Sequence, residues 1–447
     1  MFTRRLTANA FANHSVRCMS SKRPASKISK RAPTFRDFLA TSAISQNNSL
    51  NRRSTKITPA ESHPYITDEM ILGTGKKVYL DVYGCQMNVN DTEVVWSILD
   101  SMKYERTLDK KEADIWLVMT CSIRENSENK AWKALQNIRW KSTSGDYKKS
   151  LKIGLLGCMA ERLKDKMLDS KLVDVVAGPD SYRDLPRLLA VSQHSDLAAI
   201  NVILSLEETY ADVLPARLNQ DSISGFVSIQ RGCDNMCAYC IVPFTRGRER
   251  SRPFKTILDE VKALVDNGVK EVTLLGQNVN SYRDTREESI MIFGENLVQK
   301  EAELAKGFKT VYKTKTGGLR FEDLLDKVSE IDPETRIRFT APHPKDFPDQ
   351  VLHLINSRKN ICNQLHLPAQ CGSSKILEAM RRGYTRESYL ELVEQIRKII
   401  PNIRFSGDMI AGFCGETEED FEETLSLMEI VRYGTLYTFP YSLREVR

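Results

Sequence analysis

The stretch Cys233-Asp234-Asn235-Met236-Cys237-Ala238-Tyr239-Cys240 places three cysteines within eight residues, with the spacing C-x₃-C-x₂-C. Thiols this close together in a chain of 447 residues indicate metal ligation rather than disulfide pairing. A closed structural zinc site needs four ligands, and the next cysteine or histidine along the chain is His343. Three thiolates fit a [4Fe–4S] cluster that leaves one iron open to a substrate or cofactor. Zinc binding and an inert buried trio are the alternatives.

Three apolar segments upstream, at 78–85, 115–121 and 153–158, are predicted strands that end on Cys85, Cys121 and Cys158. These cysteines are 36 and 37 residues apart, and helical patterns follow them at 92–102, 125–140 and 160–168. Alternating strands and helices predict a doubly wound parallel sheet, an α/β domain in which the carboxyl ends of the strands share one edge. We therefore expect the three cysteines to converge on a second metal site. The alternative is that they are ordinary buried cysteines.

A second series of strands and helices begins at 225–230, the strand that leads into the cysteine triplet. The polar stretch 211–224 is a predicted linker. Repeated βα units indicate a partial TIM-like barrel whose site lies at the C-terminal ends of its strands. The charged stretch 283–316 is a predicted surface insertion. We expect an N-terminal domain at 76–210 and the barrel domain at 222–447. Further strands are predicted at 271–276, 336–340, 364–368, 404–410 and 435–441, and helices at 254–267, 321–331, 345–357, 386–399 and 418–431.

The N-terminal segment 1–60 is strongly basic, with twelve Lys and Arg and one acidic residue, Asp37. Its first 36 residues are rich in Arg, Ser and Ala, which is typical of a mitochondrial transit peptide; a disordered basic tail is the alternative. The remaining residues carry 53 basic and 58 acidic side chains, so nucleic-acid binding requires a local basic patch. No apolar run is long enough to span a bilayer, and we expect no membrane partner.

The cysteine triplet, placed after the first strand of a βα series, resembles the radical S-adenosylmethionine (SAM) superfamily. The segments Y-G-C-Q-M-N (83–88), T-C-S-I-R (120–124) and G-C-M-A-E-R (157–162) resemble the N-terminal domain of the methylthiotransferases within that superfamily. R-G-C-D-N-M-C-A-Y-C-I-V-P-F-T-R-G-R-E-R-S-R-P (231–253) is similar to the tRNA-modifying, MiaB-type members. The resemblance runs from about residue 65 to 441.

The resemblance implies two [4Fe–4S] clusters and SAM as cofactors. Cys233, Cys237 and Cys240 would hold the cluster that cleaves SAM to a radical, and Cys85, Cys121 and Cys158 the auxiliary cluster used in attaching sulfur. The expected reaction is methylthiolation of carbon 2 of N6-isopentenyladenosine at tRNA position 37. Methylthiolation of another tRNA adenosine or of a ribosomal protein, and a non-catalytic regulator, are the alternatives. The resemblance also implies partners: tRNA, iron–sulfur assembly and electron donor proteins and, for the mitochondrial branch, a kinase-activator protein.

Two further groups of residues follow from the resemblance. The expected SAM contacts are Tyr239 near the adenine, Gly276, Gln277 and Asn278 near the methionine part, and Asp408 and Gly412 near the adenosine. The expected RNA-binding patch is Arg246, Arg248, Arg250 and Arg252, because guanidinium groups suit phosphate contacts and base stacking. Pairing of these arginines with Glu249, or contact with the carboxylate of SAM, is the alternative. Members of the family continue beyond the position of Tyr441 into an RNA-binding TRAM domain, which we expect this chain to lack.

Overall fold

The computed structural model describes residues 66–123, 125–195, 198–293, 304–310 and 316–444. All of them fall within one compact unit of the chain. The predicted transit and disordered segment 1–60 lies outside the described residues, as does part of the predicted insertion. None of the described helices is long and apolar enough to cross a bilayer.

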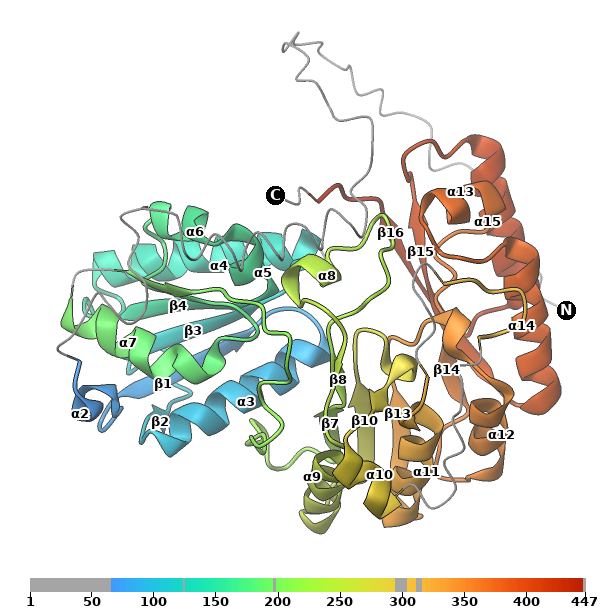
Figure 1. Cartoon of the computed structure of the whole chain (residues 1–447). Coiled ribbons are helices and arrows are strands. Elements are labelled where there is room, and N and C mark those ends of the chain that lie inside the picture. The colour runs from blue at the N-terminus through green and yellow to red at the C-terminus, as the bar shows by residue number, and fades with distance from the viewer. Residues whose placement is uncertain (1–65, 124, 196–197, 294–303, 311–315, 445–447) are drawn as a thin grey trace, which may run out of the picture. The chain divides into compact units, whose positions relative to one another are not determined.

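The N-terminal half forms a six-stranded parallel sheet in the order β2-β1-β3-β4-β5-β6 (Figure 1). Because β2 pairs on the outer side of β1, the direction of winding reverses between β1 and β3. That reversal defines the switch point of a doubly wound sheet, where ligands bind beyond the carboxyl ends of the strands. The strands are β1 (Lys77–Val82), β2 (Glu105–Arg106), β3 (Ile115–Thr120), β4 (Lys152–Gly157), β5 (Val175–Ala177) and β6 (Ala199–Asn201).

Helices cover both faces of this sheet, which explains why the central strand β3 is buried throughout and apolar up to Thr120 at its end. Ile115 and Leu117 pack into a core with α3 (Gln86–Ser101) and α7 (Leu185–His194). Trp116 and Val118 point the other way, into a core with α4 (Glu125–Ser144), α5 (Cys158–Leu163) and α6 (Asp165–Asp169). Two short elements complete this half, α2 (Asp68–Ile71) and η1 (Tyr182–Asp184).

The C-terminal half contains two three-stranded parallel sheets, in the orders β13-β10-β7 and β14-β15-β16. A parallel bridge from Ile337 to Ile361 connects the end of one sheet to the beginning of the other, which gives a partial barrel. The strands are β7 (Ser224–Ser228), β10 (Glu271–Leu275), β13 (Arg336–Phe339), β14 (Gln364–His366), β15 (Arg404–Ala411) and β16 (Thr435–Pro440).

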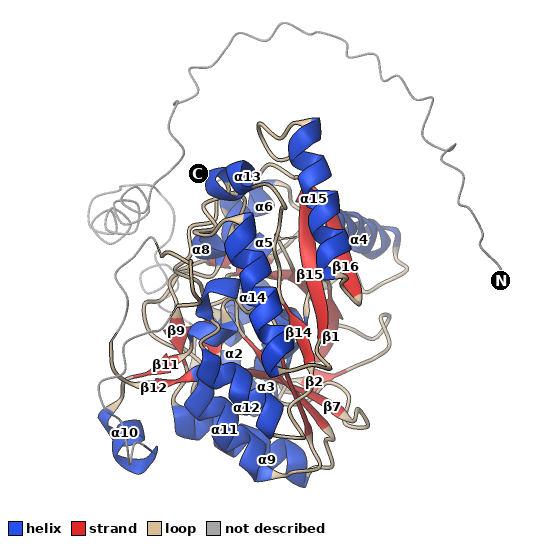
Figure 2. Cartoon of the chain, turned by 90° about the vertical axis from the view of Figure 1, so that its right-hand side faces the viewer, coloured by secondary structure: helices blue, strands red, loops and turns tan. Residues whose placement is uncertain are grey.

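Amphipathic helices cover the outside of these strands (Figure 2). In α9, for example, Phe254, Ile257 and Val261 recur at helical spacing and are all buried. The helices are α9 (Phe254–Asp266), α11 (Phe321–Ile331), α12 (Asp349–Ser357), α14 (Arg386–Ile399) and α15 (Glu418–Val431), with the shorter α8 (Val242–Thr245), α10 (Glu287–Phe293), α13 (Ser374–Ala379), η2 (Val279–Ser281) and η3 (Pro344–Asp346). Two antiparallel strand pairs close the bases of two long loops. They are β8 (Gln230–Arg231) with β9 (Arg250–Ser251), and β11 (Arg283–Asp284) with β12 (Leu319–Arg320).

The predicted fold class, a doubly wound domain followed by a partial barrel, is confirmed. The sequence interpretation omitted α7 and the short strands β2 and β6. It also began one helix too early, at Lys345, whereas α12 begins at Asp349. The reason is Pro348: the residue before a proline is excluded from the helical region, and Phe347 accordingly has a φ of −116° and a ψ of 77°.

Candidate functional site

The first three predicted ligands converge at the carboxyl edge of the N-terminal sheet. Cys85 follows β1 and is the N-cap of α3, Cys121 follows β3, and Cys158 follows β4 as the first residue of α5. The first two therefore flank the switch point between β1 and β3. The thiol of Cys121 hydrogen-bonds to that of Cys85, and Cys158 lies close enough to interact electrostatically with both. We call these three residues the N-terminal triad.

The backbone passes unusually close to this triad at Gly84. Its φ is +130°, and a Cβ placed there would lie 2.7 Å from the Cβ of Cys121 and 2.6 Å from the side-chain Nδ2 of Asn88. A side chain is therefore excluded at this position on both conformational and steric grounds. The glycine allows the first strand to approach the second cysteine.

The protonation of the N-terminal triad is suited to metal binding. The hydrogen bond from Cys121 lowers the pKa of the Cys85 thiol to about 6, while burial raises the pKa of Cys158. Ionising a buried thiol without a counter-charge is unfavourable. A metal centre that replaces the thiol protons removes this cost, so the three donors fit a cluster that binds thiolates.

The second set of predicted ligands lies on the loop that the β8–β9 pair closes. We call residues 230–251 the cysteine loop, and Cys233, Cys237 and Cys240 the loop triad. Gly232 enters the loop with a φ of +74°, and a Cβ there would lie 2.1 Å from the carbonyl oxygen of Arg248. Burial raises the pKa of the Cys240 thiol to about 12. These donors, like those of the N-terminal triad, fit a bound cluster better than free thiolates.

Within the described part of the chain, no three Cys, His, Asp or Glu side chains surround a point where a single metal ion would sit. A [4Fe–4S] cluster does not require such a point, because each cysteine binds a different iron atom.

Each triad has a buried arginine beside one thiol. Arg246 donates from Nε to the Sγ of Cys158 at 3.1 Å, and Arg382 donates from Nη1 to the Sγ of Cys237 at 3.5 Å. Arg382 also hydrogen-bonds to the hydroxyl of Tyr239 at 3.3 Å. The sequence interpretation missed Arg382, because it lies 142 positions after Cys240 and no pattern connects the two segments.

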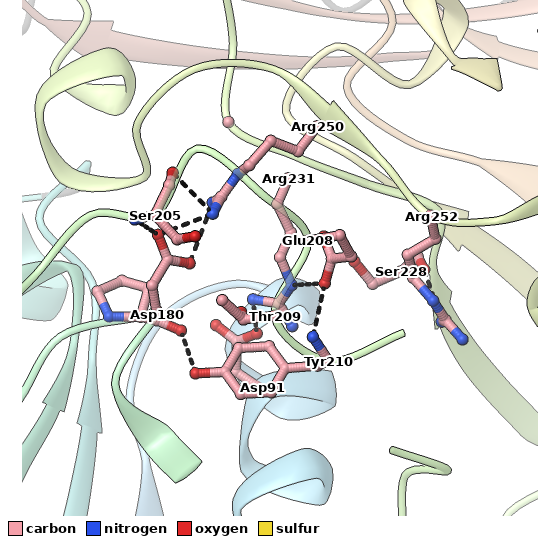
Figure 3. Close-up of polar contacts among 12 residues, drawn as sticks. Asp91, Asp180, Ser205, Glu208, Thr209, Tyr210, Ser228, Arg231, Arg250 and Arg252 are labelled. Atoms are coloured by element: carbon pink, nitrogen blue, oxygen red, sulfur yellow. Dashed lines mark hydrogen bonds and ion pairs between the residues drawn. The ribbon is translucent and has the colours of Figure 1, made fainter. Parts of the chain in front are cut away.

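The predicted RNA-binding patch requires a correction. Arg246, Arg250 and Arg252 are 2%, 6% and 5% exposed and are paired with carboxylates inside the protein. Arg250 meets Asp180 at 2.9 Å, whereas Arg252 meets Glu260 at 2.6 Å. Figure 3 shows Arg250 beside Asp180, with Arg252 set apart beside Ser228. These three guanidinium groups form buried ion pairs within the protein, which the run of arginines in the sequence did not reveal.

Only Arg248 of the four reaches the surface to a substantial degree, with 36% of its side chain exposed. It forms two hydrogen bonds with the carboxylate of Asp234, at 3.1 and 3.3 Å.

The predicted SAM contacts occupy three places in the C-terminal half: the cysteine loop, which carries Tyr239, the segment directly after β10, and β15 with the turn that follows it. Directly after β10, Gln277 accepts a hydrogen bond from the backbone N–H of Gly232, and Gly276 precedes it. Asn278 is buried, donates to Asp346 at 3.1 Å, and its Oδ1 has no hydrogen-bond partner among the described residues.

The remaining two contacts lie on or just after β15. Asp408 faces His366 of β14, with 3.2 Å between Oδ2 and Nε2. Gly412 has a φ of +79° and its N–H donates to the carboxylate of Glu416. Gln277 thus contacts Gly232 of the cysteine loop, and Tyr239 contacts Arg382. Among the described residues, no hydrogen bond or ion pair joins Asp408 or Gly412 to the cysteine loop or to Arg382.

Two family models match the chain. Residues 227–428 match the radical SAM superfamily, and residues 77–178 match the uncharacterized protein family UPF0004. The first match contains the loop triad and the second contains the N-terminal triad.

Curated relatives cover most of the chain. The mitochondrial tRNA methylthiotransferase CDK5RAP1 of Rattus norvegicus is 55% identical over 415 residues, which are 92% of this chain and 69% of the relative. A CDK5RAP1-like protein of Caenorhabditis elegans is 51% identical, over 93% of this chain and 75% of the relative. The tRNA-2-methylthio-N(6)-dimethylallyladenosine synthase of Chloroherpeton thalassium is 49% identical, over 82% and 74%.

Among solved structures, the radical SAM methyltransferase TsrM from Kitasatospora setae aligns with a TM-score of 0.55 and 13% identity, over 83% of this chain and 76% of that one. The cobalamin-dependent radical SAM enzyme OxsB aligns with a TM-score of 0.53, over 80% and 52%. At this identity the alignments show a shared fold only.

Proposed function

Because the chain belongs to the tRNA methylthiotransferase family of radical SAM enzymes, we propose that it methylthiolates carbon 2 of N6-isopentenyladenosine at position 37 of mitochondrial tRNAs. The name of the bacterial relative specifies the 2-methylthio product of dimethylallyladenosine, which carries the isopentenyl group. The name of the rat relative specifies mitochondrial tRNA. The basic composition of residues 1–60 supports a mitochondrial location.

The observation that carries the proposal is the presence of two separate cysteine triads, one gathered at the carboxyl ends of three parallel strands and the other on the loop that follows β7. We assign the loop triad to the [4Fe–4S] cluster that binds SAM and the N-terminal triad to a second [4Fe–4S] cluster. When bound, the first cluster would supply the electron that cleaves SAM, and the second would serve in attaching sulfur. A chain that only bound SAM would need the first triad alone.

The surrounding residues shape the SAM site. Gln277 fixes the start of the cysteine loop by accepting from Gly232. The unpaired Oδ1 of the buried Asn278 is an acceptor suited to an ammonium group. Burying such an acceptor without a partner costs free energy, and a ligand that donates to it removes that cost. We retain Tyr239, Gly276, Asp408 and Gly412 as further proposed contacts.

For tRNA, we retain only Arg248 as a proposed phosphate contact. Its guanidinium group is the most exposed of the four and lies on the cysteine loop, close to the proposed SAM cluster in sequence. The proposed chemistry also requires a one-electron donor, which in cells would be a protein.

The test is anaerobic reconstitution of the chain with iron and sulfide, followed by incubation with SAM, dithionite and mitochondrial tRNA from cells that lack the gene. We expect eight iron atoms per chain, formation of deoxyadenosine, and methylthiolated isopentenyladenosine in the tRNA by mass spectrometry. Cys121→Ser should lose four irons and the tRNA product while retaining deoxyadenosine formation. Cys237→Ser should lose four irons and both products.

Other outcomes identify the competing functions. Four irons in the unsubstituted chain would refute the two-cluster assignment. A product on another adenosine, or on a ribosomal protein offered in place of tRNA, would reassign the substrate. Deoxyadenosine without any methylthiolated product would contradict the proposal.

A further inference from the structure

The side chains of three arginines of the cysteine loop form ion pairs with carboxylates of the N-terminal domain. Arg231 and Arg246 both pair with Asp91 of α3, at 2.8 and 2.7 Å. Arg250 pairs with Asp180, which follows β5, at 2.9 Å. All three guanidinium groups are buried, and Figure 3 shows Arg231 and Arg250 reaching these carboxylates.

The charges of this network balance. Arg231 also approaches Glu208 at 3.6 Å, so three arginines face the three carboxylates of Asp91, Asp180 and Glu208. A buried ion without its partner is strongly unfavourable, so the network admits the loop only in the position where every charge is paired. It therefore fixes the cysteine loop against the edge of the N-terminal sheet.

Arg246 differs from the other two because it also contacts a predicted cluster ligand. Its Nε donates to the Sγ of Cys158 at 3.1 Å, and its Nη2 donates to Oδ1 of Asn88 at 3.2 Å. Asn88 in turn donates to the carbonyl of Tyr83 at 2.7 Å, just before Cys85. Arg246 is also the C-cap of α8, the single turn that follows Cys240. One side chain therefore connects the segment after the loop triad to two cysteine positions of the N-terminal triad.

We propose that Arg246 is the positioning residue that couples the two triads. It holds the cysteine loop in register with the N-terminal sheet through Asp91, and it donates a charge-assisted hydrogen bond to the sulfur of Cys158. This inference rests on the proposed assignment of the N-terminal triad to a cluster. A positive N–H donor at a cysteine sulfur stabilises the more negative, reduced form of a cluster, so Arg246 raises the reduction potential of a cluster held there.

The test isolates the N-terminal triad. In the full chain with Cys233→Ala, Cys237→Ala and Cys240→Ala, only that triad can hold iron, and we expect four irons per chain. The midpoint potential is then measured by redox titration followed by electron paramagnetic resonance. Arg246→Met should shift the potential to a more negative value, and Arg246→Lys, which keeps the charge, should shift it less.

Two further variants separate this role from simple structural damage. Asp91→Asn removes the negative charge beside Arg246 but keeps the arginine and an amide oxygen that can accept from it, so it should shift the potential in the opposite, positive direction. Arg252→Lys is the matched control, because Arg252 is also buried and paired with a carboxylate but contacts Glu260 and the carbonyl of Ser228 instead of a cysteine. The midpoint potential of the Arg252→Lys variant should equal that of the triple-alanine parent.

Hydrogen exchange provides a second readout. Amides of α3 and α5 should exchange faster in Arg246→Met and remain at the parent rate in Arg252→Lys. Unchanged potential in Arg246→Met, shifts of the same sign in Arg246→Met and Asp91→Asn, or no iron at the N-terminal triad of the parent would each overturn the inference.

These measurements need neither tRNA nor turnover. An unsubstituted chain that never yields methylthiolated tRNA, although the triple-alanine parent shows the expected shifts, would refute the proposed function and support the inference. If the unsubstituted chain methylthiolates tRNA but Arg246→Met keeps the potential and exchange rates of the triple-alanine parent, the inference is refuted and the proposed function is supported.

Discussion

Glu93 should make the stability of the N-terminal domain fall as the pH rises. This residue of α3 is buried beside the segment that leads to the barrel, where its carboxylate accepts from the N–H of Leu218 at 3.3 Å. Burial is the main cause that raises the pKa of Glu93 to about 7, and repulsion from Glu260 raises it further. The hydrogen bond from the Leu218 N–H and the positive charges of Arg217 and Arg106 lower this pKa, but by less than burial raises it. The carboxyl group is therefore easier to protonate in the folded than in the unfolded chain.

The magnitude follows from the two pKa values. An unfolded glutamate titrates at 4.5 and the folded one at about 7, so the folded state binds more protons between these values. The resulting stabilisation is complete below pH 4.5 and is lost as the pH rises through 7. Since one pKa unit corresponds to about 1.4 kcal/mol, Glu93 removes about 3 kcal/mol over this range.

The assay uses the tryptophans as a local probe. All four, Trp96, Trp116, Trp132 and Trp140, lie in the N-terminal half of the chain, so their fluorescence during urea unfolding reports on the N-terminal sheet. Glu93→Gln keeps an acceptor for Leu218 but cannot ionise. At pH 8 this variant should therefore be more stable than the parent by about 3 kcal/mol, and at pH 4.5 the two should agree.

Glu105→Gln, at an exposed position of β2, is the control for removing one negative charge. If the difference in stability between Glu93→Gln and the parent does not change between pH 4.5 and 8, the reasoning about Glu93 is refuted.

Three further substitutions test other parts of the structure. Asp91→Asn leaves two buried arginines without their shared partner and should cost about 3–5 kcal/mol by tryptophan fluorescence, whereas Asp259→Asn, in an exposed helical pair, should cost under about 0.5 kcal/mol. Equal losses would contradict the buried network. Gly232→Ala places a Cβ 2.1 Å from a backbone oxygen, so reconstituted iron should fall from eight atoms to four; retention of eight would disprove the steric argument. Thr417→Ala removes the N-cap of α15 and should cost about 1 kcal/mol, seen as faster amide exchange in that helix but not in α9.

Much of the architecture could be predicted from local pattern. The segments at 386–399 and 418–431 are helices with those bounds, because each is amphipathic, begins after a threonine cap and ends where the apolar spacing ends. The short strands β2 and β6 could not be predicted in this way. Glu105 and Arg106 are exposed and carry no apolar alternation, and they form a strand only because β1 offers a free edge.

The cysteines of the site could be predicted because strand-end position is a property of sequence, and parallel strands bring their ends together. The partners of the arginines could not. Asp91 and Asp180 look like ordinary charged residues of a helix and a turn, and nothing local shows that their side chains are buried. An arginine-rich segment has the same sequence pattern whether its side chains bind phosphate or buried carboxylates, so tertiary contacts decide which of the two it does.

This ambiguity has a physical consequence for how the two halves of the chain are held together. Burying three ion pairs contributes little net stability, because the desolvation of six charged groups offsets their attraction. An apolar interface of the same size would hold the cysteine loop as tightly, but it would tolerate a small slide of the loop along the sheet. The paired charges do not, since a slide that separates Arg246 from Asp91 leaves both ions buried and unpaired. We therefore infer that the network specifies position more than it adds stability, which suits the proposed arrangement in which both triads face one substrate.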